Sequence, residues 1–213
     1  MKRKITMILA LALVLSMAAF TACGADKATA QADQKSTVDT ILSAGTTQAF
    51  KDEPVPEADV STILRAGLSA TSAMNAQPWF FAAVSDKALL REIDSPEEGG
   101  SAGPNAGMGD SPLAIIIYKD DHSASFNADL DCGLAVQNMY IAAVSLGYGA
   151  KLVSSPTLSL NGADHDAICA KLGVDPSLTA VTVLLVGKPD MTVDGVTGAS
   201  PREGLGEKTS IIG

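Results

Sequence analysis

The stretch TSAMNAQPWFFAAV, residues 71–84, marks the point where a predicted helix gives way to a predicted strand. The helix opens at Pro56, and its apolar residues follow the i, i+3, i+4, i+8 spacing of one buried face: Val60, Ile63, Leu64 and Leu68. Pro78 cannot continue a helix, and the aromatic, apolar run Trp79–Val84 is typical of a strand. Three polar side chains occupy the corner between them: Ser72, Asn75 and Gln77. Such residues either form an ordinary turn or face a ligand.

The rest of the pattern indicates a layered α+β or α/β domain with few strands. Residues 113–118 form an apolar run typical of a strand buried on both faces. Residues 127–147 form the longest helical pattern, and because apolar residues surround most of its circumference we expect a central, buried helix. The Gly-rich residues 95–112 are predicted to form a long loop or lid. Shorter elements complete the order helix, strand, helix, strand, long helix, helix, strand: helices over 87–93 and 162–172 and a strand over 181–186.

The N-terminus is typical of an export signal. Three basic residues at positions 2–4 precede an unbroken apolar run from Met7 to Leu15, and small residues follow. The sequence Phe20-Thr21-Ala22-Cys23 resembles a bacterial lipobox, so we predict a signal peptide over residues 1–22 and a lipidated Cys23. The alternative is an uncleaved anchor, for which the run is shorter than the roughly 20 apolar residues that span a bilayer. Both readings place the domain on the extracytoplasmic side of the cell membrane.

A flexible linker is predicted to follow the anchor. Residues 23–37 carry the lipidated cysteine and then small polar residues without an apolar period. Residues 38–213 remain as one domain that is long enough to bury a core.

The charge balance excludes two classes of partner. Without the basic residues at positions 2–4, 12 basic side chains remain against 24 acidic ones, a net charge of −12. This balance argues against nucleic acid and against a polybasic contact with anionic lipid. We therefore expect contact with the membrane through the lipid anchor only.

No metal site is predicted. Cys132 and Cys169 belong to no CxxC pair and no His cluster, and we expect two buried free thiols, although an oxidising compartment would permit a disulfide between them. Asp120, Asp121 and His122 follow a strand and are typical of a solvated turn. His165, in a short predicted helix, is interpreted in the same way.

The corner stretch resembles the PS-x-x-N-x-QPW-x-F signature of the nitroreductase family of flavoproteins. Four further segments resemble that family in the same order: VPEADVSTILRAGL at 55–68, SPLAIIIY at 111–118, DLDCGLAVQNMYIAAVSLGYGA at 129–150 and VTVLLVGKP at 181–189. The resemblance covers nearly all of residues 38–202. It implies an α+β fold with a central, mostly antiparallel sheet flanked by helices and a long buried central helix.

The resemblance also implies an intertwined homodimer that holds FMN in a cleft at the subunit interface. Ser72 and Asn75 are then expected to hydrogen-bond the flavin ring or ribityl chain, with Gln77 near them. Ser154 and Ser155 correspond to the family's contact with the ring edge that carries the reactive nitrogen, where backbone donors would stabilise negative charge on reduced flavin. The family's C-terminal tail places a basic residue against the phosphate, and Arg202 corresponds to it.

One segment departs from the family pattern. The family opens with R-R-S-x-R-x-F, whose arginines bind the FMN phosphate, and AGTTQAF stands here at 44–50. Charge-assisted phosphate contacts contribute about 1.5 to 3 kcal/mol each, so we expect reduced affinity for FMN unless other groups compensate. Thr46 and Gln48 retain neutral donors, and Arg65 or Lys151 are alternative cations.

The function that the resemblance implies is hydride transfer through FMN to a nitroaromatic, quinone or similar small-molecule acceptor, with the chemistry supplied by the cofactor. NAD(P)H is the family's usual donor, but it is a cytoplasmic metabolite. For an extracytoplasmic domain we therefore expect another donor: a membrane quinol, another flavoprotein or a diffusing reduced flavin. The alternative function is a flavin-binding or flavin-sensing lipoprotein without turnover.

Overall fold

The computed structural model describes residues 36–94, 107–193, 197–198 and 201–212. The chain divides into two units, residues 1–39 and 40–213, and the second unit holds the sheet and the helices that pack on it. The predicted signal peptide, Cys23 and nearly all of the linker lie outside the described residues, as does most of the predicted 95–112 loop. None of the described helices combines the length and the apolar character that a membrane crossing requires.

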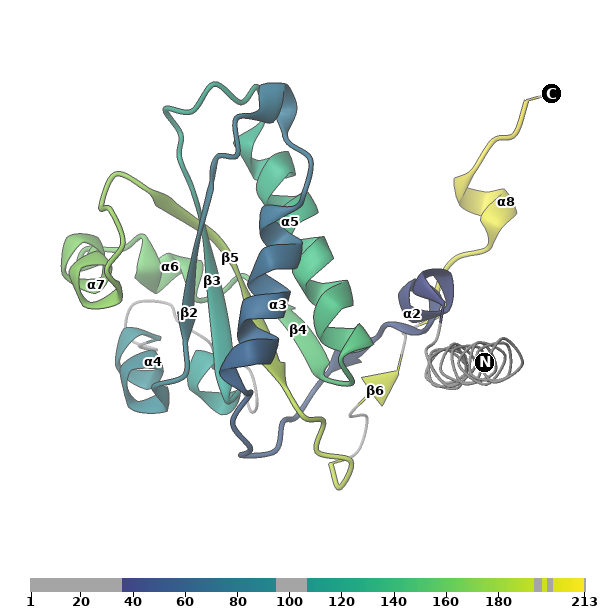
Figure 1. Ribbon diagram of the computed structural model, residues 1–213, viewed down its shortest axis with the longest axis horizontal. Coiled ribbons are helices and arrows are strands. Elements are labelled where there is room, and N and C mark those ends of the chain that lie inside the picture. The colour runs from purple at the N-terminus through teal and green to yellow at the C-terminus, as the bar shows by residue number, and fades with distance from the viewer. Residues whose placement is uncertain (1–35, 95–106, 194–196, 199–200, 213) are drawn as a thin grey trace, which may run out of the picture. The chain divides into compact units, whose positions relative to one another are not determined.

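A six-stranded sheet forms the centre of the second unit (Figure 1). Its spatial order is β2 (Trp79–Val84), β3 (Leu113–Lys119), β5 (Thr179–Gly187), β4 (Gly149–Val153), β1 (Thr46–Thr47) and β6 (Thr197–Gly198). Neighbouring strands are antiparallel except for β1 and β4, which run parallel. The prediction of a mostly antiparallel sheet is confirmed.

Helices cover both faces of this sheet. The first layer is α3 (Glu57–Leu68) and α5 (Ala128–Ser145), which share a buried cluster with Ile115, Ile117 and Leu184. The second layer is α4 (Lys87–Ile93), α6 (Thr157–Leu160) and α7 (His165–Leu172), which pack against the opposite side chains of the same strands. Strand residues alternate between the two clusters because successive side chains of a strand point to opposite faces. The remaining described elements are short: α2 (Thr37–Ser43), α8 (Leu205–Lys208) and the 3-10 turns η1 (Ala73–Asn75) and η3 (Met108–Asp110).

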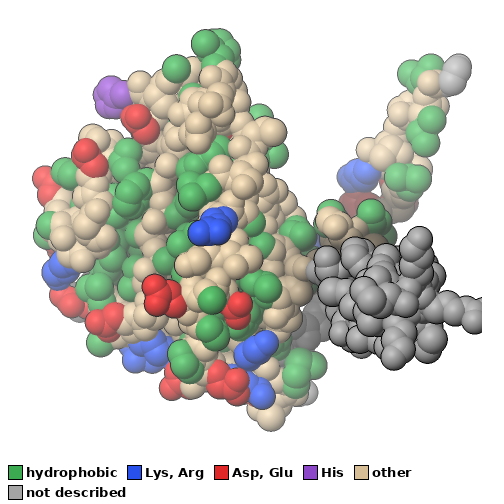
Figure 2. All heavy atoms as spheres, viewed as in Figure 1, with side chains coloured by type: hydrophobic (Ala, Val, Ile, Leu, Met, Phe, Trp, Pro, Cys, Tyr) green, Lys and Arg blue, Asp and Glu red, His purple; other side chains and the backbone are tan. Residues whose placement is uncertain are grey.

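The long predicted helix is α5, and its burial is one-sided. Seven of its residues are buried, including Cys132, Met139 and Ala143. The opposite side is open to solvent, with Leu130 58% and Leu134 41% exposed. On the face that carries α3 and α5, apolar side chains reach the surface at many points and charged side chains are scattered singly or in small groups (Figure 2). A central helix is confirmed, while its exposed apolar strip differs from the expected burial on all sides.

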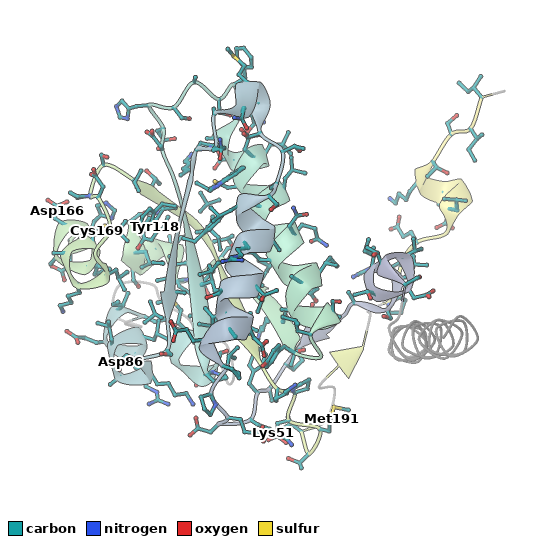
Figure 3. All side chains as sticks on the ribbon, in the orientation of Figure 1. Lys51, Asp86, Tyr118, Asp166, Cys169 and Met191 are labelled. Carbon is teal, nitrogen blue, oxygen red and sulfur yellow. The ribbon has the colours of Figure 1, made fainter. Side chains whose placement is uncertain are left out.

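The two cysteines are free and buried, and they lie on opposite faces of the sheet. Cys132 of α5 packs in the first layer, whereas Cys169 of α7 packs in the second layer, toward which Tyr118 extends from β3 (Figure 3). A disulfide requires Cα atoms within about 7 Å, which a sheet between two helix layers does not allow. The prediction of two free thiols is therefore confirmed.

Trp79 begins β2 directly after the corner. Its ring is 9% exposed and stacks on Phe81, with 6.3 Å between ring centroids and 10° between ring planes. Pro78 before it is also buried, and its carbonyl oxygen accepts the N–H of Asp120 at 2.7 Å. The start of the strand is thus fixed both by packing and by a backbone hydrogen bond to the end of β3.

The predicted solvated turn leaves Asp121 and His122 exposed, whereas His165, for which the same reading was given, is half-buried. His165 places one ring nitrogen 2.7 Å from the Leu160 carbonyl oxygen and the other 3.0 Å from that of Pro176. Asp120 accepts the His122 N–H at 2.8 Å in an exposed turn. Among the residues that the structure describes, no group of three or more His, Cys, Asp or Glu side chains is arranged to hold a metal ion.

Candidate functional site

The corner between α3 and β2 is a tight, internally bonded loop. The Ser72 hydroxyl accepts the N–H of Gln77 at 3.0 Å, and the Ser72 carbonyl accepts the N–H of Asn75. Asn75 and Gln77 are exposed, while Ser72 is half-buried. The amide of Asn75 has no side-chain hydrogen bond within the described ranges, and that of Gln77 donates only a long one, 3.4 Å, to the Asn75 carbonyl. Two polar side chains thus remain available to a ligand.

A buried carboxylate on α5 holds this loop. Both carboxylate oxygens of Asp131 accept the N–H of Ala73, at 3.1 and 3.2 Å, and one of them also accepts the Ser125 hydroxyl at 2.6 Å. Asp131 is 3% exposed. Hydrogen bonds to a buried charge are stronger than neutral ones, so the loop is fixed to the first turn of the central helix.

The loop backbone is strained. Met74, Asn75 and Gln77 all have left-handed φ angles, of 55°, 56° and 48°, and they are the non-glycine residues with positive φ in the described chain. The left-handed conformation costs about 1 to 2 kcal/mol for such residues. Strain of this kind persists where the surroundings enforce it and concentrates at ligand sites. Three such residues within four positions make this corner a candidate ligand site.

A pocket of about 390 Å³ lies beside β1. That volume falls within the range of small-molecule sites. Two residues that the resemblance assigned to the phosphate end, Thr46 and Arg202, line it together. The other lining residues are uncharged: Ile41, Leu42, Ala44, Gln137, Tyr140 and Leu152.

Tyr140 organises the wall of this β1 pocket. Its hydroxyl donates to the Gly45 carbonyl at 2.7 Å and is also hydrogen-bonded with the Thr46 side chain. Burial raises the pKa of the Tyr140 phenol, while the Thr46 hydrogen bond and the positive charge of Arg202 act in the opposite direction. The phenol therefore stays protonated at neutral pH, and its proton is committed to the backbone of the 44–48 segment.

Ser154 and Ser155 follow the end of β4 and are exposed. Side chains alternate along a strand, so Ser154 lies on the same side of the sheet as Leu152, which lines the β1 pocket. The Ser154 hydroxyl is 3.5 Å from that of Thr182 on β5. Neither serine lines the β1 pocket.

The other predicted phosphate contacts are not gathered at this pocket. Gln48 is exposed and lines neither of the two pockets beside β1. Lys151 points to the opposite side of the sheet from Leu152, since the two are consecutive strand residues. Arg65 is exposed in the last turn of α3. The structure thus brings Thr46 and Arg202 together and leaves Gln48, Lys151 and Arg65 apart.

A second pocket, of about 290 Å³, lies across the same segment. Ser43, Gly45 and Thr47 line it, so residues 43–47 present alternate positions to the two pockets. The Thr47 hydroxyl is buried there and has no hydrogen-bond partner among the described residues. A side chain introduced at position 45 would therefore enter this second pocket, whereas one introduced at position 44 would enter the β1 pocket.

The two halves of the candidate site lie on different flanks of α5. Asp131, which holds the 72–77 loop, and Tyr140, in the β1 pocket, are nine residues apart on the helix. Nine residues correspond to about 13.5 Å along the axis and to about 180° around it. One chain thus holds the two halves on different flanks of α5 and at separate positions along its axis.

Sequence reasoning missed two residues of this site. Asp131 and Tyr140 lie within the long helical segment that carried the family resemblance, but their roles depend on contacts 58 and 95 positions away in the chain. A sequence signal existed for Asp131, because a carboxylate within an otherwise buried helical pattern requires a partner.

Comparisons with known proteins agree with this architecture. A model of the nitroreductase family matches residues 41–188. A relative from Archaeoglobus fulgidus, named a putative NADH dehydrogenase/NAD(P)H nitroreductase, is 30% identical over 147 residues, which are 67% of this chain and 79% of that protein.

Solved structures share the fold. A nitroreductase with bound FMN from Bacteroides fragilis has a TM-score of 0.72 at 22% identity, covering 84% of this chain and 100% of its own. A nitroreductase with bound FMN from Desulfitobacterium hafniense has a TM-score of 0.70 at 22% identity, covering 83% of this chain and 98% of its own.

Proposed function

This chain belongs to the nitroreductase family, and we propose that it is an FMN-dependent oxidoreductase tethered to the extracytoplasmic face of the cell membrane. Its acceptor is a nitroaromatic, a quinone or a similar small molecule. The observation that carries this proposal is the strained 72–77 loop. Asp131 holds it in place, and its two exposed amide side chains make between them one long hydrogen bond within the described residues.

The residues fit a flavin at the ring end. Asn75 and Gln77 can each donate and accept hydrogen bonds, which suits the alternating donors and acceptors of a flavin ring edge. The Ser72 hydroxyl accepts the Gln77 N–H, and its own proton remains available to a ligand. At the other end, Thr46 and Arg202 offer a hydroxyl and one guanidinium to a ribityl phosphate.

When bound, FMN supplies the hydride transfer, and the protein supplies position and electrostatics. Asp131 fixes the loop backbone, so that only the Asn75 and Gln77 side chains would have to order when a ring binds. Ser154 and Ser155 provide polar groups at the end of β4, where negative charge on a reduced ring would be stabilised by fixed dipoles.

The proposed active form is a homodimer. The 72–77 loop and the β1 pocket lie on different flanks of α5, so a flavin that contacts both halves would take the loop from one chain and the pocket from its partner. The exposed strip of α5, with Leu130 and Leu134, supports burial against a second copy. A co-refolded equal mixture of an Asn75→Ala/Gln77→Ala variant and an Ala44→Trp variant, whose β1 pocket is filled, should recover flavin binding at about one quarter of its sites, because half of the dimers are mixed and each mixed dimer has one intact site. Recovery at none of them would contradict a shared site.

The electron donor is proposed to be other than NAD(P)H, because of the proposed location. The relative from Archaeoglobus fulgidus is named for NADH and NAD(P)H. The rates at which NADPH and other donors reduce the flavin must therefore be compared on this protein itself. We expect a membrane quinol or a reduced flavin to bleach the bound flavin faster than NADPH. Rapid bleaching by micromolar NADPH would contradict this choice of donor.

An absorption spectrum from 350 to 500 nm tests the function itself. A yellow protein whose bands fade with a reductant and return with an acceptor supports the oxidoreductase. A yellow protein that resists reduction favours the second candidate function, a flavin-binding or flavin-sensing lipoprotein. The observation that favours this candidate is that Arg202 is the one charged residue in the described lining of the β1 pocket. A colourless protein that does not bind added flavin would contradict both functions.

Cys23→Ser tests the anchor. The expected result is a protein that leaves the membrane fraction without losing flavin binding. A variant that stays in the membrane fraction would indicate an uncleaved hydrophobic anchor instead.

A further inference from the structure

We infer that this site selects flavin by its ring and ribityl chain and not by its phosphate, so that riboflavin binds about as tightly as FMN. The inference rests on the proposed function, because it concerns the ligand of the same site. It follows from the chemistry of the β1 pocket, which differs from what a phosphate dianion requires.

The described lining of the β1 pocket contains one charged side chain, Arg202. Four of the eight lining residues are apolar: Ile41, Leu42, Ala44 and Leu152. A phosphate monoester carries a charge of about −1.5 to −2 at neutral pH. One guanidinium therefore leaves part of that charge uncompensated beside apolar surface, where unpaired charge is costly.

The neutral groups of the pocket do not make up the difference. The Tyr140 proton is donated to the Gly45 carbonyl, so the phenol offers no donor to an anion without breaking that bond. The Thr46 hydroxyl is hydrogen-bonded with Tyr140 and lies beside the ligand space. Hydroxyl and amide groups such as Thr46 and Gln137 suit the terminal hydroxyl of a ribityl chain, which both donates and accepts.

The cations near this end of the sheet are directed elsewhere. The Lys188 ammonium lies 4.3 Å from the centre of the Tyr148 ring and donates to the Gly147 carbonyl at 3.2 Å. Lys151 belongs to the opposite face of β4. The net negative charge of the chain adds a long-range repulsion that a neutral ligand does not experience. The placement of Lys188, the placement of Lys151 and the net negative charge of the chain all favour uncharged riboflavin over FMN, its phosphate ester.

The test is a direct comparison of two ligands on one protein. The full chain is purified, freed of flavin and titrated with riboflavin and with FMN, and each Kd is read from quenching of flavin fluorescence. We expect the two Kd values to agree within fivefold. If FMN binds more than fivefold tighter than riboflavin, the inference is overturned.

Two variants locate the effect at the β1 pocket. Ala44→Arg adds a guanidinium to the pocket lining and should tighten FMN at least tenfold while riboflavin changes less than threefold. Ser61→Arg, on the exposed surface of α3, adds the same charge elsewhere and should change neither Kd by more than threefold. If Ala44→Arg tightens both ligands equally, the phosphate does not lie at this pocket and the inference is overturned.

The outcomes separate this inference from the proposed function. FMN-selective binding by the unmodified chain overturns the inference and leaves a flavin enzyme in place. Failure to bind either flavin removes the proposed function together with the inference. Because the first comparison needs no variant, a misfolded substitution cannot obscure the result.

Discussion

The 72–77 loop and the β1 pocket are two halves of one candidate site, and they are built on different principles. The buried carboxylate of Asp131, which is 3% exposed, fixes the loop to the fold. The left-handed backbone of the loop persists because the surrounding structure enforces it. The β1 pocket depends on side chains at the surface, and its charge rests on Arg202. A change in the loop therefore disturbs folding as well as binding, whereas a change of charge in the pocket alters affinity and leaves the fold intact. The sequence resembles the family signature at the loop and departs from the family pattern at residues 44–50, so the two halves can be tested separately.

The largest expected effect comes from removing the carboxylate beneath the loop. Asp131→Ala leaves the Ala73 N–H and the Ser125 hydroxyl without their charged acceptor, and should lower the free energy of unfolding by about 3 kcal/mol. Flavin binding should weaken with it. Urea denaturation and a flavin titration measure the two effects.

Asp129→Ala is the matched control. Asp129 lies in the same turn of α5, is exposed, and pairs at 3.1 Å with Lys119, which also pairs with Asp121. The expected loss is below about 0.5 kcal/mol. If both variants lose the same stability, the loop is not held through Asp131 and the contrast between the two halves fails.

A smaller effect is expected in the β1 pocket. Tyr140→Phe removes the hydrogen bond to the Gly45 carbonyl and should cost about 1 kcal/mol in unfolding free energy. Riboflavin and FMN affinities should shift together, because the phenol supports the wall of the pocket and not the phosphate. A loss confined to FMN would show instead that Tyr140 contacts the anion.

Glycine substitutions in the loop test its backbone strain. Met74→Gly should raise the unfolding free energy by about 0.5 kcal/mol, because relief of the left-handed conformation exceeds the entropic cost of glycine. Ala73→Gly, at a neighbour without a positive φ, should lower it by about 0.5 to 1 kcal/mol. Opposite signs in chemical denaturation are expected, and equal losses would mean that the loop is not strained.

The smallest effect is confined to alkaline pH. Burial, reinforced by the hydrogen bond to Asp59, raises the pKa of Tyr148 to about 12. Tyrosine in an unfolded chain titrates near pH 10, so this stabilisation is complete below about pH 10 and disappears as the pH rises through 12. Tyr148→Phe should make the fall in unfolding free energy between pH 10 and 12 shallower than in the unmodified chain. An unchanged slope would assign the alkaline loss to Tyr118 and Tyr140, whose pKa values are also raised.

The elements with a strong period were predictable from the sequence. The helix at 87–93 has the predicted bounds, because its apolar period is clear and Asp86 caps it through two backbone N–H groups. The buried strand at 113–118 was also predicted, one residue short of its observed end. Local pattern sufficed for these elements because their burial follows directly from spacing.

The short edge strands were not predictable in the same way. β4 has Gly149 and Lys151 within five residues, so its alternation is weak, and β1 and β6 contain two residues each. These strands form through pairing with distant segments and not through local propensity. The order of helices and strands was right where elements carry their own pattern, and it lacked the strands β4, β1 and β6 and the short helices α2, α6 and α8.

The candidate site residues came from the family resemblance, whereas their geometry could not be read from the sequence. The resemblance selected Ser72, Asn75 and Gln77, but no local rule predicts left-handed φ angles at Met74 and Gln77, because these residue types rarely adopt them. Likewise, the division of residues 43–47 between two pockets depends on how β1 pairs with β4. Tertiary contacts decided both features.

Trp79, the single tryptophan of the chain, follows the loop by two residues and is shielded from solvent in its stack with Phe81. Its emission therefore comes from one position next to Gln77. Tryptophan emits where oxidised flavin absorbs, so a flavin ring at the loop would quench that emission by resonance energy transfer. The protein thus carries an intrinsic optical probe of ring occupancy, which can follow binding and release in real time without any attached label.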